Sequence, residues 1–248
     1  MNRNGESQES DFEDCWKQRF KEFARYREDD AGISGWSPTG LDARFRFFSR
    51  HWPKASPGGR WLDVGCGPGT YARFLAERGM EVVGLDYSLP SLQKAQNRSS
   101  PKLGWVVADA RRLPIEEEAA DGVLCFGVTQ SLRESESLME ELSRVTARKG
   151  MVWVDGLNGW CLPHLMTRVW RWARREPAHL RYETPWDLKR AVRRAGFGQV
   201  RLLWLPVLPA RLQRFQKWLE FQWLVRLLHA IPPLGMVMSH SMVIWAKR

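Results

Sequence analysis

The sequence predicts an α/β fold, a doubly wound and mostly parallel sheet with helices on both of its faces. Short apolar segments alternate with helical segments through most of the chain. A glycine-rich stretch follows the first clear strand, and 44% of the residues are apolar, which is typical of a chain that buries a core. At 248 residues the chain fits one such domain with a small helical lid.

The N-terminal part, residues 1–57, is expected to be a helical cap. It starts with a loose charged lead-in, followed by a helix from Cys15 to Arg27 and by a turn-rich stretch over 31–40. A further helix is expected from Gly40 to His51, with Thr39 as its N-cap. Its evidence is a set of side chains that recur at helical spacing, namely Leu41, Arg44, Phe45 and Phe48.

Seven strands are expected in the domain that follows, residues 58–248. They fall at 60–64, 81–85, 105–108, 122–126, 151–155, 199–204 and 241–246. Helices are expected between them at 70–78, 89–98, 134–147 and 186–195. The first five strands are predicted to be parallel, and the two late strands to close the sheet as an antiparallel pair, with the last strand antiparallel.

The last third of the chain is basic and rich in tryptophan. From residue 160 to the end there are 16 Lys and Arg against 4 Asp and Glu, whereas the rest holds 22 against 24. Eight of the 14 tryptophans also lie there. Two helical inserts are predicted in this third, at about 158–185 and 206–236, the second one helical over 211–230. Such a composition indicates a surface that meets something anionic and partly apolar, and a solvated basic face is the alternative.

Cellular setting is predicted from what the sequence lacks. The most apolar window, residues 221–238, is interrupted by charged side chains and two prolines, so no transmembrane helix is expected. The four cysteines lack C-x-x-C spacing, and no secretory signal is visible. We therefore expect a reduced, cytoplasmic setting, with peripheral contact at the inner membrane surface through the basic third.

The strongest functional signal is the glycine loop that runs from Asp63 to Thr70. It follows a buried strand and opens a helix, and its glycines at 65, 67 and 69 permit a sharp turn and close approach of the backbone to a ligand. Free N–H groups at the start of the helix favour an anionic group at that position.

Two carboxylates follow at the ends of the next two strands. Asp86 is placed to accept hydrogen bonds from the ribose hydroxyls of a nucleotide, and Asp109 to accept one from an adenine amino group. Each acid alone is more simply explained as a turn or cap residue. Their order after successive parallel strands predicts one shared crevice. A nicotinamide site is disfavoured, because the fingerprint G-x-G-x-x-G would need its third glycine one position later than Gly69.

These segments resemble the motifs of class I S-adenosylmethionine-dependent methyltransferases. Residues 63–69 read D-V-G-C-G-P-G and resemble the first motif, and residues 83–88 read V-G-L-D-Y-S and resemble the second. Residues 108–110, 113–114 and 120–121 resemble the third and fourth motifs, and 141–145 with 149–150 the helix and turn before the fifth strand. The resemblance covers about residues 60–156. Beyond it, the likeness is to the small-molecule methyltransferases of ubiquinone and menaquinone biosynthesis.

The resemblance implies a Rossmann-like fold, S-adenosyl-L-methionine as cofactor, and in-line methyl transfer to a small-molecule or lipid-like acceptor, an activity of EC class 2.1.1. It implies no metal. An RNA methyltransferase and a non-catalytic cofactor-binding protein of the same fold are the alternatives. The cofactor-binding residues that it implies are Asp63, Gly65, Cys66, Gly67, Gly69, Asp86, Tyr87, Asp109, Ala110 and Phe126.

The sequence assigns no catalytic residue. Family members often carry a histidine just after the fourth strand, where this chain has Gln130-Ser131, so no role is transferred. A general base is needed only when the acceptor is still protonated. The polar candidates near the first insert are Asp155, Asn158, His164, His179, Tyr182 and Glu183, and side chains of this kind are more often surface or packing residues. Residues 125–129, C-F-G-V-T, lack the [N/D]-P-P-[Y/F/W] segment of nucleic-acid base N-methyltransferases.

Overall fold

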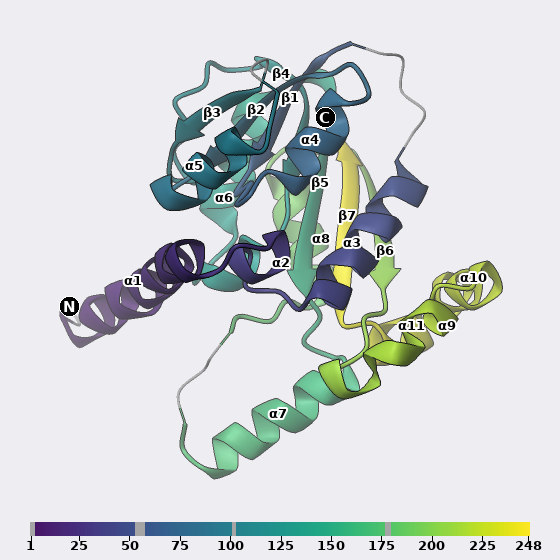
Figure 1. Ribbon diagram of the computed structural model, residues 1–248. Coiled ribbons are helices and arrows are strands. Elements are labelled where there is room, and N and C mark those ends of the chain that lie inside the picture. The colour runs from purple at the N-terminus through teal and green to yellow at the C-terminus, as the bar shows by residue number, and fades with distance from the viewer. Residues whose placement is uncertain (1–2, 53–57, 101–102, 177–179) are drawn as a thin grey trace.

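A seven-stranded sheet forms the centre of the molecule (Figure 1). The computed structural model describes residues 3–52, 58–100, 103–176 and 180–248, with side chains from residue 12 onward except at 210. The strand order is β3-β2-β1-β4-β5-β7-β6, and β7 is antiparallel to both of its neighbours while the other adjacent strands are parallel. This confirms the predicted fold. The strands are β1 (Arg60–Val64), β2 (Glu81–Asp86), β3 (Gly104–Val107), β4 (Ala120–Cys125), β5 (Thr146–Leu157), β6 (Gln199–Leu205) and β7 (Ser241–Lys247).

Helices cover both faces of the sheet, because side chains of the buried strands alternate between two apolar cores. One core joins Leu62 and Val64 to helices α6 and α8, and the other joins Trp61 to helices α3 and α4. The helices are α1 (Arg3–Tyr26), α2 (Asp30–Ile33), α3 (Pro38–His51), α4 (Thr70–Ala76), α5 (Leu89–Asn97), α6 (Glu136–Val145), α7 (Leu162–Ala173), α8 (Pro185–Arg194), α9 (Gln216–Leu219), α10 (Gln222–Ala230) and α11 (Pro232–Met238), with short 3-10 turns η1 (Thr129–Ser131) and η2 (Ala210–Phe215).

The fifth strand is longer than its predicted range of 151–155. It pairs with β7 over seven positions, from Met151 opposite Lys247 to Leu157 opposite Ser241. This register places the start of β7, and His240 before it, at the carboxyl end of β5. Residues more than 80 positions apart therefore meet beside the ends of the parallel strands.

Two predictions about the N-terminal helices were wrong. The lead-in is not loose, because α1 begins at Arg3. Thr39 is not the cap of α3: Ser37 is, since its hydroxyl accepts the Gly40 N–H at 3.1 Å and Pro38 takes the first helical position. Proline loses no helical hydrogen bond at that position, so the helix can start at Pro38, two residues before the predicted start at Gly40.

The predicted single helix over 211–230 is broken into η2, α9 and α10. The break follows from the buried side chain of Gln216, which turns back to the end of β6. Its amide donates to the Pro206 carbonyl at 3.1 Å and accepts the Leu208 N–H at 2.8 Å. Glu220 then pairs with Arg46 on α3 at 2.7 Å. Long-range contacts of this kind override local helix propensity.

Within the described residues, no helix combines the length and the apolar character that crossing a bilayer requires.

Candidate functional site

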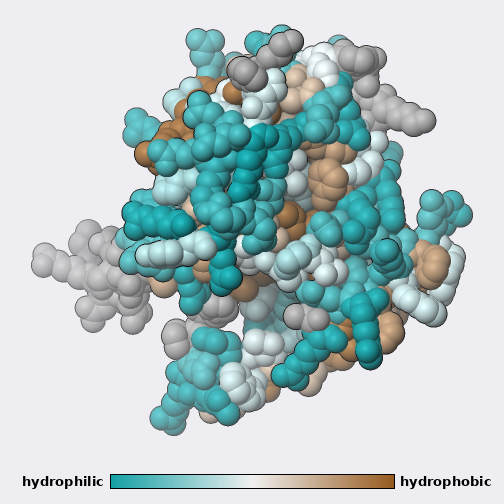
Figure 2. Space-filling view, viewed as in Figure 1, coloured by the Kyte–Doolittle hydropathy of each residue, from teal (hydrophilic) through white to brown (hydrophobic). Residues whose placement is uncertain are grey.

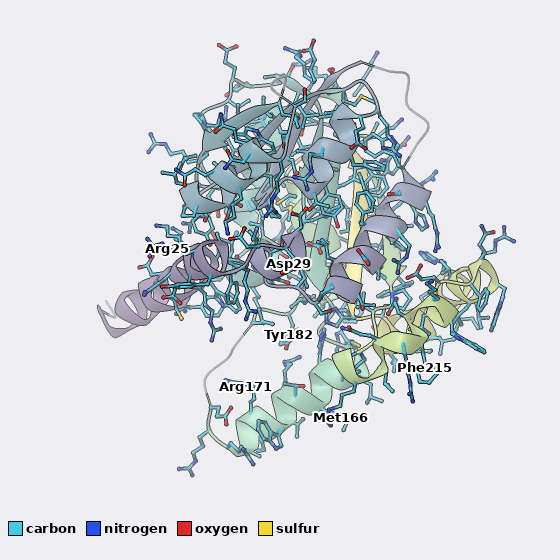
Figure 3. All side chains as sticks on the ribbon, viewed as in Figure 1. Arg25, Asp29, Met166, Arg171, Tyr182 and Phe215 are labelled. Carbon is cyan, nitrogen blue, oxygen red and sulfur yellow. The ribbon has the colours of Figure 1, made fainter. Side chains whose placement is uncertain are left out.

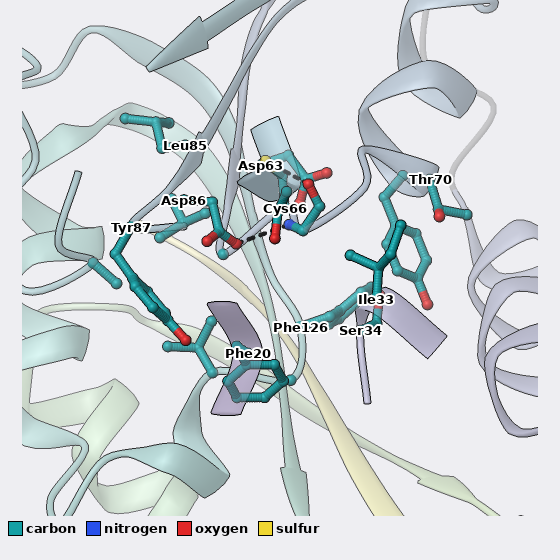
Figure 4. A pocket seen from close by; sticks show the side chains of 18 of the residues that line it. Phe20, Ile33, Ser34, Asp63, Cys66, Thr70, Leu85, Asp86, Tyr87 and Phe126 are labelled. Atoms are coloured by element: carbon teal, nitrogen blue, oxygen red, sulfur yellow. Dashed lines mark hydrogen bonds between the residues drawn. The ribbon is translucent and has the colours of Figure 1, made fainter. Parts of the chain in front are cut away.

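A pocket lies where the strands β1, β2 and β4 end (Figure 4). Its floor is the glycine loop, which is held against the second strand because the N–H groups of Gly65 and Cys66 both donate to the Leu85 carbonyl, at 2.7 and 3.1 Å. Gly65 has a φ of +72° and Gly67 one of +51°. This left-handed backbone strains any residue with a β-carbon, so glycine is required where the loop turns.

Asp86 connects the second strand to the loop. Its two carboxylate oxygens accept the N–H groups of Gly67 at 2.9 Å and Ser88 at 2.8 Å. Burial raises the pKa of this carboxyl to about 6, so it is ionised at neutral pH. Each oxygen has a further lone pair, and the side chain lines the pocket, so Asp86 can also accept hydrogen bonds from a ligand.

Asp63 lies beneath the loop and is only 2% exposed. One of its oxygens accepts the Ala72 N–H in the first turn of α4 at 3.0 Å, which fixes that helix relative to β1. Burial raises the pKa of Asp63 to about 7, with the neighbouring carboxylate of Asp86 acting in the same direction.

The raised pKa of Asp63 predicts how stability changes with pH. At a pH between 3.8, the ordinary Asp value, and about 7, the Asp63 carboxyl carries a proton in the folded protein but not in the unfolded chain. The contribution of Asp63 to the free energy of unfolding is therefore largest at low pH and is lost as the pH rises through 7, with a slope of at most about 1.4 kcal/mol per pH unit. Denaturant unfolding across this range should show that the stability of the wild type relative to Asp63→Asn falls as the pH rises; the comparison cancels the contributions of Asp86, whose pKa is also raised, and of the buried histidines, whose pKa is lowered. Parallel curves for both proteins would contradict the assignment.

Of the ten predicted cofactor-binding residues, eight line this pocket. Gly69 does not line it and is the N-cap of α4, with a φ of +80°. The carboxylate of Asp109 accepts hydrogen bonds from the Arg111 side chain at 2.9 and 3.1 Å and also pairs with Lys17 at 3.3 Å, and these partners hold its pKa below the ordinary value. Its neighbours Ala108 and Ala110 are the residues of this segment that reach the pocket. The eight are Asp63, Gly65, Cys66, Gly67, Asp86, Tyr87, Ala110 and Phe126.

Sequence reasoning missed one wall of the pocket, which the N-terminal helices supply. Phe20 of α1, Ile33 of α2 and Arg44 of α3 line it, together with Trp36 between the last two helices. No local pattern predicts this placement, because the wall depends on contacts with residues 40 or more positions away. Tyr71 and Ser131 were also missed as lining residues.

Asp30 fastens this wall to the body of the molecule. Its carboxylate accepts a hydrogen bond from the Thr70 hydroxyl at 2.6 Å, pairs with Arg73, and pairs with Arg98 at 2.8 Å. Thr70 is the first residue of the helix that follows the glycine loop. A single carboxylate therefore joins α2 to the loop region, which closes the pocket on the side of the N-terminal helices.

The polar candidates near the first insert form a second group, beyond the end of β5. The ring of His164 lies 4.4 Å from that of His240 and 4.7 Å from that of Tyr182, and burial lowers the pKa of both histidines. His164 Nδ1 is 2.8 Å from the Asn158 carbonyl. Glu183 is buried and accepts from Ser135 at 2.9 Å, whereas His179 lies outside the described residues. In the described part of the chain, no three acidic, histidine or cysteine side chains are grouped as metal ligands.

Comparison with known proteins agrees with this geometry. Residues 62–154 match the family model described as a methyltransferase domain. The chain is 31% identical over 167 residues to the ubiquinone biosynthesis O-methyltransferase of Chromobacterium violaceum. The aligned part covers 62% of this chain and 70% of that protein. It is 36% identical over 104 residues to the malonyl-[acyl-carrier protein] O-methyltransferase of Salmonella typhimurium, with 42% of this chain and only 41% of that protein covered.

Among solved structures, an S-adenosylmethionine-dependent methyltransferase from Mesorhizobium loti matches with a TM-score of 0.61 and 18% identity. The match covers 84% of this chain and 100% of that one, and at this identity it speaks for the fold alone. The strand order with an antiparallel seventh strand, the glycine loop bonded to Asp86, and the matched relatives lead to one conclusion. The chain belongs to the class I S-adenosylmethionine-dependent methyltransferases, and S-adenosyl-L-methionine is its methyl donor.

Proposed function

We propose that this methyltransferase acts on a small-molecule or lipid-like acceptor, which it meets at an anionic membrane surface. The residues of the pocket fit the donor. Gly67 presents bare backbone to the pocket, Asp86 offers free lone pairs to ribose hydroxyls, and the loop leads into the start of α4. When bound, S-adenosyl-L-methionine supplies a methyl group on a positively charged sulfur. An acceptor in line with the carbon–sulfur bond takes the methyl group, and the sulfur leaves as the thioether of S-adenosylhomocysteine. The protein orients the two partners and excludes water.

The N-terminal wall is proposed to exclude that water, which predicts an effect of opening it. Asp30→Ala removes the carboxylate and with it the contacts to Thr70, Arg73 and Arg98. We expect S-adenosylhomocysteine to dissociate about tenfold faster from this variant. Stopped-flow displacement measures this rate. Asp42→Ala is the matched control, because Asp42 is an exposed acid on α3 outside the pocket. Equal rates for all three proteins would contradict the role of Asp30 in closing the pocket.

The observation that carries the membrane proposal is an exposed aromatic surface on the two inserts. Of the 19 large hydrophobic side chains exposed in the described part of the chain, 15 lie within residues 160–172 and 212–238. Trp172 is 80% exposed, Trp218 67% and Trp223 65%. Residues 160–175 and 206–238 contain eight arginines and lysines and one acid, Glu220. Exposed tryptophan with surrounding basic residues is typical of helices that lie in the interface of an anionic bilayer.

The aromatic surface lies at the pocket end of the sheet. In Figure 1, α7 and α9–α11 extend beyond the ends toward which the parallel strands point. Figure 3 labels Met166 on α7 and Phe215 at the end of η2, directly before α9. Figure 2 shows hydrophobic residues along the lower edge of the α9–α11 segment. Asn158 holds the bases of the two inserts together, because its amide donates to the Met236 and Ser239 carbonyls at 2.6 and 2.7 Å. A membrane bound there faces the acceptor side of the enzyme.

Cosedimentation with vesicles tests this proposal. We expect binding to vesicles rich in phosphatidylglycerol but not to neutral phosphatidylcholine, with loss at high salt. Replacing both Trp218 and Trp223 by alanine should weaken binding at least about tenfold, since each ring loses its apolar burial in the bilayer. Tyr26→Ala, which removes an exposed aromatic ring from α1, should change nothing. No sedimentation of the wild type would overturn the membrane proposal.

The same assays separate the alternatives. An RNA methyltransferase would bind RNA through the basic residues with a steep salt dependence, and loss of the two tryptophans would affect RNA more weakly than vesicles. A non-catalytic relative would bind S-adenosylhomocysteine but transfer no methyl group from labelled donor to any extracted lipid or small-molecule fraction.

A further inference from the structure

A second pocket lies between α3 and the α9–α10 segment, beside the end of β6. Its volume is about 300 Å³, at the lower end of the range that ligand pockets occupy. Helix α3 contributes the face that carries Ala43, Phe47 and Arg50, whereas Leu41 and Arg44 on another face line the donor pocket. No described residue lines both pockets, so the second pocket is a separate site.

The interior of this pocket is largely apolar. The buried side chains of Phe47 and Leu205 line it, together with Leu219 and Val225 from the second insert. An unfilled apolar pocket lacks the dispersion contacts that close packing provides, and a hydrocarbon chain supplies them. The interior therefore favours a ligand with a hydrocarbon part.

Polar side chains hold the walls of this pocket in place. The buried amide of Gln216 bonds to the Pro206 carbonyl at 3.1 Å and to the Leu208 N–H at 2.8 Å. The His51 ring lies 4.2 Å from the Phe47 ring, and its Nδ1–H donates to the Phe47 carbonyl at 2.9 Å. Gln216, His51 and Phe47 all line the pocket, so its shape exists before a ligand binds.

Arginines dominate the charge of this pocket. Arg50 and Arg226 line it, against one acid, Glu220. Glu220 already pairs with Arg46 at 2.7 Å and with Arg50 at 3.2 Å. Arg226 is exposed, and none of the acidic side chains that the structure describes lies within salt-bridge range of it. Burial lowers the pKa of His51, so this ring adds no charge at neutral pH. The rim of the pocket therefore offers one unpaired guanidinium to a ligand.

The helices that line this pocket also carry exposed aromatic rings. Trp218 and Trp223 are next in the chain to the lining residues Leu219 and Gln222, and neither tryptophan lines the pocket itself. Helices α9 and α10 thus have one side toward the pocket and an exposed apolar side beside it. An apolar surface next to the pocket suits a ligand that carries a hydrocarbon chain.

We propose that this pocket binds a single hydrocarbon chain that ends in a carboxylate, as in a fatty acid. The chain lies against Phe47, Leu205 and Val225. The carboxylate pairs with Arg226, and Arg50 is the second cation at the site. A singly charged head group balances the one unpaired guanidinium, whereas a phosphate monoester would bring excess negative charge. The proposal depends on neither methyl transfer nor membrane binding, because a soluble fatty carboxylate tests it.

Isothermal titration calorimetry with decanoate, below its micelle concentration, tests the proposal. We expect one saturable site on the wild-type protein. Octanoate should bind about fifteenfold more weakly, because each buried CH₂ group changes affinity about fourfold. Decyltrimethylammonium has the same chain with the opposite charge and should bind at least about tenfold more weakly than decanoate. Arg226→Gln should weaken decanoate binding about threefold, whereas Arg211→Gln, an exposed arginine of η2 outside the pocket, should not.

Filling the pocket distinguishes it from the exposed aromatic surface. Val225→Phe on α10 and Ala43→Leu on α3 each add carbon atoms to the lining, and each should weaken decanoate binding at least about tenfold. Val237→Phe is the matched control, because Val237 is an exposed valine of α11 that does not line the pocket. All variants should keep the wild-type affinity for S-adenosylhomocysteine, which shows that the fold is intact.

Absence of saturable decanoate binding by the wild type would overturn the proposal, whether or not the variants fold. Unchanged binding by both filled variants would overturn it too, since the ligand would then lie on the exposed surface. Equal affinity of the wild type for decanoate and decyltrimethylammonium would overturn the role of the arginines. A protein that binds decanoate but not S-adenosylhomocysteine would instead contradict the methyltransferase function and leave this site in place.

Discussion

Asp86→Ala is expected to weaken binding of S-adenosylhomocysteine by about a hundredfold, and at least tenfold. The substitution removes the proposed acceptor of the ribose hydroxyls, where hydrogen bonds to a charged group are worth about 1.5–3 kcal/mol each. It also removes the bond from Gly67, at 2.9 Å, that holds the glycine loop. Isothermal titration calorimetry at neutral pH measures the change directly.

The control is another aspartate that accepts a backbone N–H at the opposite end of the sheet. Asp121 accepts the Arg60 N–H at 2.7 Å, so Asp121→Ala loses a comparable bond without touching the pocket. We expect its cofactor affinity to be unchanged. Unaltered affinity in Asp86→Ala would reject the ribose role.

The pKa of Asp86 adds a pH dependence to the same measurement. Because burial raises this pKa to about 6, protonation removes acceptor capacity as the pH falls through 6, and wild-type affinity should decline there. Asp86→Asn should start weaker and lack this decline. An identical pH profile in both proteins would indicate that another group titrates.

The centre of the site was predictable because its determinants are local. A strand, a glycine loop and a helix start follow one another within 63–70, and the next strand ends in Asp86, so parallel pairing alone brings them together. Asp109 shows where this reasoning ends. Its order in the chain matched the expected position, but Arg111, two residues later, takes up its carboxylate. Strand order does not specify the direction of a side chain.

The N-terminal wall was out of reach for a different reason. The helical spacing of Leu41, Arg44, Phe45 and Phe48 predicted the helix, and Leu41, Arg44 and Phe48 are buried in α3. Two neighbours of Arg44, Ser241 and Asp155, come from strands more than 100 residues later, and their pairing depends on the register of β5 with β7. A sequence pattern predicts that a face is buried. It does not predict which charges meet there.

Gly65→Ala is expected to abolish measurable cofactor binding, a loss of at least about a hundredfold, while the sheet still folds. An added β-carbon would lie 2.2 Å from Val128 Cγ2, and the φ of +72° would strain any non-glycine residue by about 1–2 kcal/mol. Valine is stiff about χ1, and Val128 lines the pocket, so a shift of Val128 that relieves the clash moves a wall of the site.

Adding Val128→Ala relieves the clash but leaves the backbone strain, so the double variant should regain only part of the affinity. Gly198→Ala, where an added β-carbon meets nothing within 4 Å, serves as control. Wild-type affinity in Gly65→Ala would mean that the loop binds the cofactor in another conformation, because neither the clash nor the strain would then have lowered the affinity.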